Sequence, residues 1–371
     1  MHAKKLVPQI RFKGFEEEWK NVLIEDIIFS LPYKKYIKSS SISGSFPIIQ
    51  QGNEPICGFA NGIPFSNYKN VIIFGDHTLS IYKPKSPFFV ASDGIRILKS
   101  KNDMPSEFIY RVIEKYLPNS HGYTRHFLIL KMQEAKISVA YKEQEKIGLL
   151  FSNLDSLITS QELKLQKFQA IKQSLLDKMF VSNNEKVPKI RFKGFEEEWK
   201  ENKIKYLFEI TRGEVLSQNK IQKYSNSFYI YPVYSSQTMK KGLMGYYHNY
   251  LFENCITWTT DGANAGTVMY RDEKFYCTNV CGVLKEYKIK PNICLAQSLN
   301  NVANNYVTRN GNPKLMNNTI SEIEIKYPVS NIEQGKISKL LNNLDTLITS
   351  QEIKLEKLNN IKKSLLEKMF C

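Results

Sequence analysis

Two short stretches of the chain carry amide and hydroxyl side chains of the kind that pair with the edges of nucleic-acid bases. The candidate base contacts are Gln50, Gln51, Asn53, Ser235, Ser236 and Gln237. An amide can bond adenine through two hydrogen bonds, and a hydroxyl can bond to any of several bases. The chemistry that these residues suggest is recognition of a polymer, not conversion of a substrate.

Basic residues accompany these stretches. The lysines that could neutralise phosphates are Lys34, Lys35, Lys240 and Lys241. A Thr-Arg pair also recurs within a weak match between residues 122–132 and 306–316, which makes Arg125 and Arg309 candidates for contact with a phosphate or a guanine.

A run of small polar residues, 259–266, contains two glycines and could approach a DNA backbone or base closely. Thr260 and Asn264 are its candidate contacts. A solvated loop is a sufficient explanation for any one of the residues named so far. Taken together, they favour double-stranded DNA as the partner.

Patterns typical of catalysis are missing from the sequence. No Gly-rich phosphate loop occurs, and residues 312–315 (NPKL) do not match the tetrapeptide with which amino-methylating DNA enzymes grip a flipped base. The pair Asp76-His77 could suggest a hydrolase, but a tight turn between two strands explains it equally well, and we expect the turn. The histidines and cysteines lack metal-ligand spacing. We therefore expect no catalytic residue, no metal and no cofactor bound by this chain.

Composition agrees with a nucleic-acid partner. The 371 residues carry a net charge of +16, although a Lys-rich background composition could account for part of that surplus. No stretch approaches 18 apolar residues, and the first twelve residues lack the apolar core of a signal peptide. Scattered cysteines are typical of reduced thiols. We expect a cytoplasmic protein that makes no contact with a membrane.

One helical stretch occurs twice and organises the chain. Residues 147–180 and 337–370 are identical at 22 of 34 positions, contain no proline and place apolar side chains at steps of three and four. Each copy is therefore predicted to be a long helix with one apolar seam. Pairing of the two in an antiparallel coiled coil explains seams of this length, while packing of each helix on its own domain is the alternative.

A second repeat, the arm, precedes each half: residues 7–20 and 187–200 are identical at 13 of 14 positions. The predicted organisation is an arm and first domain over 1–140, a first long helix over 141–180, a second arm and domain over 181–330, and a second long helix over 331–371. The inserts between the arms and the helices do not resemble each other over most of their length.

Both inserts show short β-branched and aromatic runs punctuated by Gly, Asn and Asp, with one short helix each. Strands are predicted within residues 45–53, 70–83, 88–100, 135–141, 228–237, 251–262, 266–273, 275–287 and 322–328. Helices are predicted over 106–116 and 292–300, and Ser330 with Glu333 predicts a capping box. The fold class is therefore mixed α/β: two α/β domains separated by an antiparallel coiled coil of two long helices, with pseudo-two-fold symmetry.

The repeated patterns resemble a known family. EQ-x-KI, LD-x-LI and LL-x-KMF in both long helices, and P-x-IRF-x-GF-x-x-EW in both arms, resemble the conserved regions of type I restriction–modification specificity subunits. The inserts, with FPIIQQGN and FGDHT in the first and YPVYSSQ and TTDGANAGTV in the second, look like target recognition domains of that family.

The resemblance implies a non-catalytic subunit that reads a bipartite DNA target and carries two methyltransferase subunits and two restriction/translocase subunits. It also implies that S-adenosylmethionine, ATP and Mg²⁺ are bound by those partners. The poor match between the inserts implies two different half-sites. Two alternatives stay open from the residues: the specificity subunit of a fused restriction–methylation enzyme (type IIB/IIG-like), and an interaction protein that uses the coiled coil only to associate.

Overall fold

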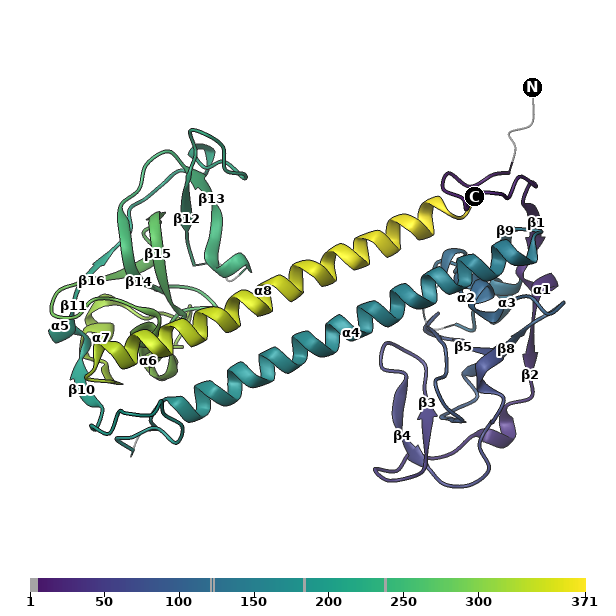
Figure 1. Ribbon diagram of the computed structural model, residues 1–371, viewed down its shortest axis with the longest axis horizontal. Helices are drawn as coiled ribbons and strands as arrows, with labels where there is room; N and C mark the ends of the chain where they lie inside the picture. Colours follow the sequence, from purple (N-terminus) through teal and green to yellow (C-terminus); the bar gives the residue numbers. More distant parts are fainter. Residues whose placement is uncertain (1–5, 121, 123, 183–184, 237–238) are drawn as a thin grey trace. The chain divides into compact units, whose positions relative to one another are not determined.

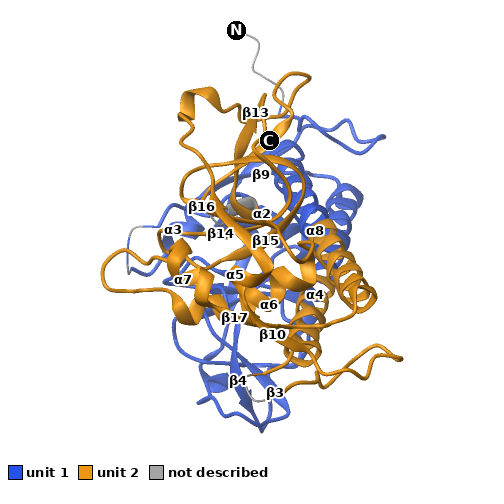
Figure 2. Ribbon diagram, turned by 90° about the vertical axis from the view of Figure 1, so that its left-hand side faces the viewer, with its two compact units in different colours: residues 1–163, 352–371 blue, residues 164–351 orange. Residues whose placement is uncertain are grey.

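The structure is a computed structural model that describes the chain except residues 1–5, 121, 123, 183–184 and 237–238 (Figure 1). The side chains of residues 239 and 240 also lie outside this description. Two compact units are present, coloured blue and orange in Figure 2. Unit 1 comprises residues 1–163 and 352–371, and unit 2 comprises residues 164–351. Each unit therefore contains one domain together with part of both long helices.

The long helices are α4 (Tyr141–Met179) and α8 (Asn331–Lys368). Both predicted helices are confirmed, and they begin at residues 141 and 331, as predicted, six residues before the repeated stretch. In unit 1, Ile147 near the start of α4 lies in one apolar cluster with Phe370 just after α8. In unit 2, Phe180 just after α4 lies in one cluster with Ile337 near the start of α8. The start of one helix thus packs beside the end of the other in each unit, as an antiparallel pair requires.

Unit 1 contains a four-stranded sheet, a three-stranded sheet and a two-stranded sheet. The four-stranded sheet has the order β2 (Ile28–Leu31), β8 (Ile95–Ser100), β5 (Val71–Gly75) and β6 (Ile81–Tyr82). The three-stranded sheet has the order β4 (Ile56–Ala60), β3 (Phe46–Ile49) and β7 (Phe89–Val90), and β1 (Lys20–Leu23) pairs with β9 (Glu134–Ile137). The helices of the domain are α1 (Ile24–Ile27), α2 (Ser106–Lys115), α3 (Phe127–Lys131) and the 3-10 turns η1 (Lys34–Tyr36) and η2 (Tyr68–Asn70).

Unit 2 contains a six-stranded and a two-stranded sheet. The six-stranded sheet has the order β11 (Phe208–Arg212), β16 (Cys281–Glu286), β14 (Phe252–Thr259), β15 (Val268–Cys277), β12 (Tyr231–Tyr234) and β13 (Leu243–Tyr247). In the other sheet, β10 (Lys200–Lys203) pairs with β17 (Glu324–Tyr327). The helices are α5 (Ile204–Leu207), α6 (Ile293–Ala303), α7 (Asn317–Glu322) and the 3-10 turns η3 (Gln218–Lys220), η4 (Met239–Gly242) and η5 (Asn304–Tyr306).

The two domains share one topology although their sequences differ. The order β2-β8-β5-β6 in unit 1 corresponds to β11-β16-β14-β15 in unit 2. The parallel pair β3 and β7 corresponds to the parallel pair β12 and β15, and a register shift interrupts both β3–β4 and β12–β13. The long strand β15 takes the places of both β6 and β7. The predicted strand break between residues 273 and 275 is therefore wrong, because β15 continues through it to Cys277.

The arm of each half is fastened to a long helix through one buried carboxylate. In unit 1, the Arg11 guanidinium donates to both oxygens of Glu143 at 2.7 and 2.9 Å, and Trp19 Nε1 donates to the same group at 3.2 Å. In unit 2, Arg191 binds both oxygens of Glu333 at 2.7 and 2.8 Å. The hydrogen bond to the glutamate raises the pKa of each arginine. We call an arm and the helix ends that it contacts a frame.

The predicted capping box is only half formed. The Glu333 N–H donates to Ser330 Oγ at 3.4 Å, but the Glu333 carboxylate binds Arg191 instead of returning to the helix start. The ion pair offers that carboxylate a charged partner, which is the stronger hydrogen bond.

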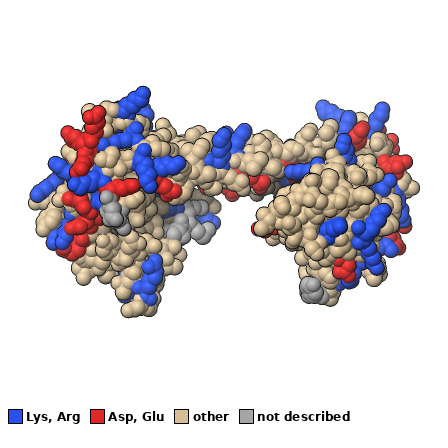
Figure 3. Space-filling view, turned by 90° about the horizontal axis from the view of Figure 1, so that it is seen from below, with Lys and Arg blue, Asp and Glu red and all other residues tan. Residues whose placement is uncertain are grey.

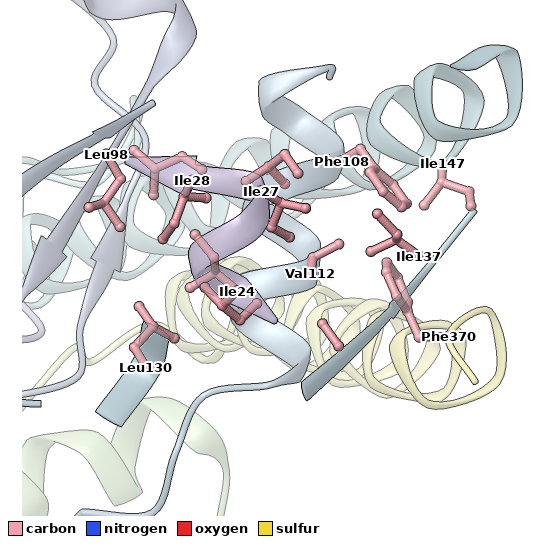
Figure 4. Close-up of a cluster of buried hydrophobic side chains, with 14 of the residues drawn as sticks. Ile24, Ile27, Ile28, Leu98, Phe108, Val112, Leu130, Ile137, Ile147 and Phe370 are labelled. Atoms are coloured by element: carbon pink, nitrogen blue, oxygen red, sulfur yellow. The ribbon is translucent and has the colours of Figure 1, made fainter. Parts of the chain in front are cut away.

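The core joins domain and frame in unit 1. One apolar cluster contains residues of α1, β8 and α2 together with Ile147 of α4 and Phe370, just after α8. Figure 4 shows Phe108, Ile137 and Phe370 of this cluster next to one another. In unit 2 the frame cluster around Trp199 is separate from the domain core around Trp258. Within the part of the chain that the structure describes, none of the helices combines the length and apolar character needed to cross a membrane.

Candidate nucleic-acid interface

The turn that follows β5 of unit 1 contains the buried carboxylate of Asp76. This group is fully buried and accepts from Arg96 Nε at 3.2 Å, Arg96 Nη2 at 3.1 Å and the Phe127 N–H at 2.8 Å. The predicted turn at Asp76-His77 is present. Its aspartate also ties β5, β8 and the start of α3 to one another, a role that the sequence did not reveal.

Gln51 and Arg125 are brought together by this turn. Gln51 Oε1 accepts from the His77 N–H at 3.1 Å, and His77 Nδ1 lies 3.1 Å from the carbonyl oxygen of Thr124. Arg125 is about half exposed and donates to Asp93 Oδ2 at 2.7 Å. The hydrogen bond between them raises the pKa of Arg125 and lowers that of Asp93. The Arg125 guanidinium is therefore held at Asp93 and half exposed, and His77 links its loop to that of Gln51.

The remaining predicted contacts of unit 1 lie on the loop after β3 and on η1. Gln50 Nε2 donates to the carbonyl oxygen of Glu54 at 2.9 Å, and Asn53 is exposed in this loop. Lys34 and Lys35 are exposed on η1, directly after Tyr33. The Tyr33 hydroxyl accepts from Arg96 Nη1 at 2.9 Å, which links η1 to the Asp76 turn.

In unit 2, the loop from β12 to β13 holds the corresponding candidates. The Ser235 N–H donates to the Gly242 carbonyl oxygen at 3.0 Å, and Ser235 Oγ accepts from Thr278 Oγ1 at 2.9 Å. Ser236 is half-buried, and Lys241 is exposed with a left-handed φ of 56°. Gln237 and the side chain of Lys240 lie outside the described residues.

Arg271 on β15 holds this loop in place through hydrogen bonds. It was not among the residues selected from the sequence. Its Nη2 donates to the Lys241 carbonyl oxygen at 2.7 Å and its Nε to Thr257 Oγ1 at 3.3 Å. The guanidinium carbon lies 3.6 Å from the ring centroid of Tyr234, whose hydroxyl donates to Glu273 at 2.6 Å. Burial raises the pKa of Tyr234. A cavity of about 20 Å³, room for roughly one water, lies beside Arg271.

The other candidates of unit 2 are more dispersed. Thr260 is buried, and its hydroxyl donates to Asp261 at 2.6 Å, so that group is already used within the turn. Asn264 is half-buried in the same turn, where its carbonyl oxygen accepts from Thr267. Arg309 is exposed and donates to Asn304 Oδ1 at 2.8 Å.

Charge is distributed over both units. On the face in Figure 3, Lys and Arg side chains are interspersed with Asp and Glu and do not form one continuous patch. Among the described residues, no group of three or more His, Cys, Asp or Glu is placed to hold a metal ion. The six cysteines are free thiols. The candidate interface thus consists of hydrogen-bonding loops on two similar domains.

Comparisons with a family model and with solved structures identify the class of protein to which the chain is similar. A family model described as the type I restriction modification DNA specificity domain matches residues 196–360. The fold is that of a solved type I restriction–modification S subunit from M. genitalium, with a TM-score of 0.76 and 15% identity over 98% of this chain and 99% of that one.

Relatives from Mycoplasma pneumoniae give the particular family. The N-terminal part of a putative type I specificity subunit is 40% identical over 144 residues, which are 38% of this chain and 74% of the relative. A second putative type I specificity subunit is 37% identical over 145 residues, 37% of this chain and 45% of the relative. The chain belongs to the type I specificity subunits, as the repeated motifs predicted. This family supplies DNA recognition to restriction–modification systems and is not catalytic.

Proposed function

We propose that this chain reads a bipartite double-stranded DNA target, one half-site with each α/β domain, and that its two frames dock two methyltransferase subunits. Two restriction/translocase subunits join the complex for cleavage. The chain itself contributes recognition and spacing. S-adenosylmethionine, ATP and Mg²⁺ are bound by the partner subunits, and the complex acts on DNA in the cytoplasm.

The proposal that the frames dock methyltransferase subunits rests on apolar residues that are exposed at equivalent positions of both repeats. In each repeat the same positions are between 39% and 61% exposed: Val7, Ile10, Leu157, Leu163 and Ile171, and their equivalents Val187, Ile190, Leu347, Ile353 and Ile361. Exposed apolar residues on an arm and a long helix are typical of a protein interface. Equivalent surfaces accept equivalent partners, which supports one methyltransferase per frame.

The reading proposal rests on the shared topology of the domains. The loop after β3 and the loop after β12 occupy corresponding places, and each is held by hydrogen bonds from a neighbouring strand or turn. Side chains on fixed loops can discriminate bases, because little order has to be gained on binding. Different residues on corresponding loops support two different half-sites.

Expression with the cognate methyltransferase tests the proposal. We expect sequencing of methylated adenines to give one bipartite motif, and native mass spectrometry to give two methyltransferases per chain. Leu163→Asp and Ile353→Asp, which alter equivalent positions, should each weaken the docking of one methyltransferase. The proposal fails if the chain directs no sequence-selective methylation.

A further inference from the structure

The β12–β13 hairpin, which carries candidate contacts of unit 2, exposes apolar side chains at its other end. β12 and β13 form one edge of the six-stranded sheet, and the candidate contacts lie on the loop between them (Figure 1). The opposite end consists of residues 222–230, which lead into β12, and residues 248–251, which follow β13. Phe228 is 62% exposed there, and Ile230 is 50% exposed. Exposed apolar side chains that gather on one element are typical of a contact surface.

The Phe228 ring is held in a fixed position although it is exposed. The N–H groups of Phe228 and Tyr229 donate to Asn226 Oδ1 at 2.9 and 2.8 Å, and the Asn226 N–H donates to the Tyr229 carbonyl oxygen at 3.2 Å. The Phe228 ring centroid lies 5.2 Å from that of His248 and 5.1 Å from that of Tyr229. We call residues 226–229 the aromatic turn. Because the ring is already ordered, little conformational entropy is lost when a partner covers it.

Unit 1 has a shorter and less aromatic segment at the corresponding place. An isolated bridge from Ser41 precedes its hairpin, as one from Gln222 does in unit 2. Four residues lie between Ser41 and the start of β3, whereas eight lie between Gln222 and the start of β12. The register places Asn61 where unit 2 has His248, and Ile42 is the fully exposed apolar residue of the shorter segment. The aromatic turn is therefore an addition to the second domain.

The charge of the hairpin favours a polyanion as the partner of the aromatic turn. Residues 215–252 contain the turn, both strands and the loop between them, and they include four lysines and no Asp or Glu. The chain has 36 Asp and Glu residues, so about four would be expected in a stretch of this length. Lys220 and Lys223, which precede the aromatic turn, are exposed. Lysines beside apolar rings suit DNA, because they can neutralise phosphates on either side of a contact with bases.

Carboxylates approach the hairpin from the neighbouring segments and not from the hairpin itself. These are the side chains of Glu214, Glu253, Asp272 and Glu273. Glu253 lies opposite Lys274 in the register of β14 and β15, and Lys274 Nζ lies 4.9 Å from the ring centroid of Tyr250. Glu273 accepts from the Tyr234 hydroxyl, and burial raises the pKa of this carboxyl group. Two of the four are therefore compensated by a lysine or a hydrogen bond within the sheet.

The length of the hairpin allows one duplex to contact both of its ends. The four residues of β12 span about 13 Å, which is about four base-pair rises of DNA. A duplex that contacts the loop between β12 and β13 can therefore also reach the Phe228 ring. Apolar side chains that enter between base pairs unstack them and kink the duplex, and pyrimidine–purine steps yield most easily.

We propose that Phe228, supported by Ile230, inserts as an apolar wedge between two base pairs of the DNA that unit 2 binds. The second domain then selects a deformable base step in addition to the bases that its loop contacts. The first domain, which lacks the aromatic turn, does not make this selection. The inference rests on the proposed function, in which each domain binds one half-site.

Fluorescence of 2-aminopurine tests the wedge, because the base becomes brighter when it is unstacked. The full-length chain is bound to its methyltransferase and to its methylated motif, with the probe placed at successive positions of either half-site. The methylated adenine, which a methyltransferase rotates out of the helix, is the internal control. Phe228→Ala removes the wedge, Phe228→Leu retains an apolar side chain, and Ile42→Ala is the matched control in unit 1. Affinity for the methyltransferase is also measured without DNA.

We expect the wild-type complex to unstack one further step, confined to the second half-site. Phe228→Ala should lose that signal, keep the signal at the methylated adenine and bind the duplex about tenfold more weakly, within the range for loss of a ring that stacks on a base. Phe228→Leu should retain part of the signal, and Ile42→Ala should behave as the wild type does.

A wild-type complex with no further unstacked step, or a step that persists in Phe228→Ala, would overturn the inference and leave the proposed function intact. Weaker binding of Phe228→Ala to the methyltransferase without DNA would also overturn it, because the aromatic turn would then be a surface for protein docking. A wild-type complex that showed no sequence-selective binding of DNA would overturn the proposed function itself.

Discussion

Arg271→Lys should loosen recognition of one half-site and leave the other intact. Arg271 is 8% exposed and reaches three groups at once: the Lys241 carbonyl oxygen, Thr257 Oγ1 and the Tyr234 ring. A lysine keeps the positive charge but has no planar fork, so one ammonium cannot maintain all three contacts. The β12–β13 loop would lose its anchor at Lys241, where φ is left-handed.

The magnitude follows from the bond that is lost. A hydrogen bond from a charged donor contributes about 1.5–3 kcal/mol. If this free energy holds the β12–β13 loop in its DNA-binding conformation, its loss lowers the fraction of the protein in that conformation. Binding to the cognate second half-site then weakens by about 10- to 150-fold. Arg271 is buried and neutralises no phosphate, so the slope of affinity against salt concentration should not change.

The assay is fluorescence anisotropy of the chain–methyltransferase complex on duplexes in which either half-site is altered, at two salt concentrations. Arg212→Lys, an exposed arginine at the end of β11, is the control and should bind as the wild type does. Arg96→Lys should give the reciprocal result, a loss confined to the first half-site, because Arg96 holds Asp76. Unchanged discrimination by Arg271→Lys, or a shallower salt slope, would refute the reasoning.

Three further predictions concern the frame, a buried thiol and the long helices. Glu143→Gln should lower the free energy of unfolding by about 3–5 kcal/mol, since it leaves Arg11 unpaired. The loss should exceed that of Glu333→Gln, because Glu143 also accepts from Trp19 and Ser138. Equal losses of the two variants in denaturant titrations would contradict this. Burial raises the pKa of the Cys255 thiol from 9.0 to about 11. The stability that the protonated thiol contributes is therefore complete below pH 9 and is lost as the pH rises to 11. A free energy of unfolding that fell equally between pH 9 and 11 in Cys255→Ala would count against this. The 39 residues of α4 span about 58 Å, and a second TSQE inserted after Glu162 would lengthen the helix by about 6 Å. The spacer between the two half-sites should therefore shift by one or two base pairs. Methylation that kept the original spacer would show that the helix length does not set the spacing.

The sequence was sufficient for the parts of the fold that depend on local periodicity. Apolar steps of three and four over a proline-free stretch predicted both long helices, and their pairing followed from two seams in one chain. The helix starts at residues 141 and 331 were predicted as well, but the ion pairs that hold those starts, Glu143 with Arg11 and Glu333 with Arg191, join residues far apart in the sequence and were not.

Features that depend on distant partners could not be predicted. The strand was predicted to break at residue 274, but β15 continues through it, and the neighbouring Glu273 carboxylate accepts from the Tyr234 hydroxyl on the adjacent strand. The common topology of the domains depends on the parallel pairs β3–β7 and β12–β15, which leave no mark in the sequence.

The candidate interface was predicted as a set of residue types and not as an arrangement. Gln51 and Arg125 were selected for their chemistry, and the structure joins them through His77 and Thr124. Asp76 was interpreted only as a turn residue, because its role depends on Arg96 and Phe127 in three dimensions. Arg271 escaped notice for the same reason.

The exchange of residues 201–330 for the matching domain of another member of the family tests the central claim most directly. The hybrid chain, expressed with the same methyltransferase, is examined by sequencing the methylated adenines of the host DNA. We predict a new second half-site, an unchanged first half-site and an unchanged spacer. A hybrid that remained active and altered both half-sites, or neither, would contradict the claim that each domain reads one half of the target.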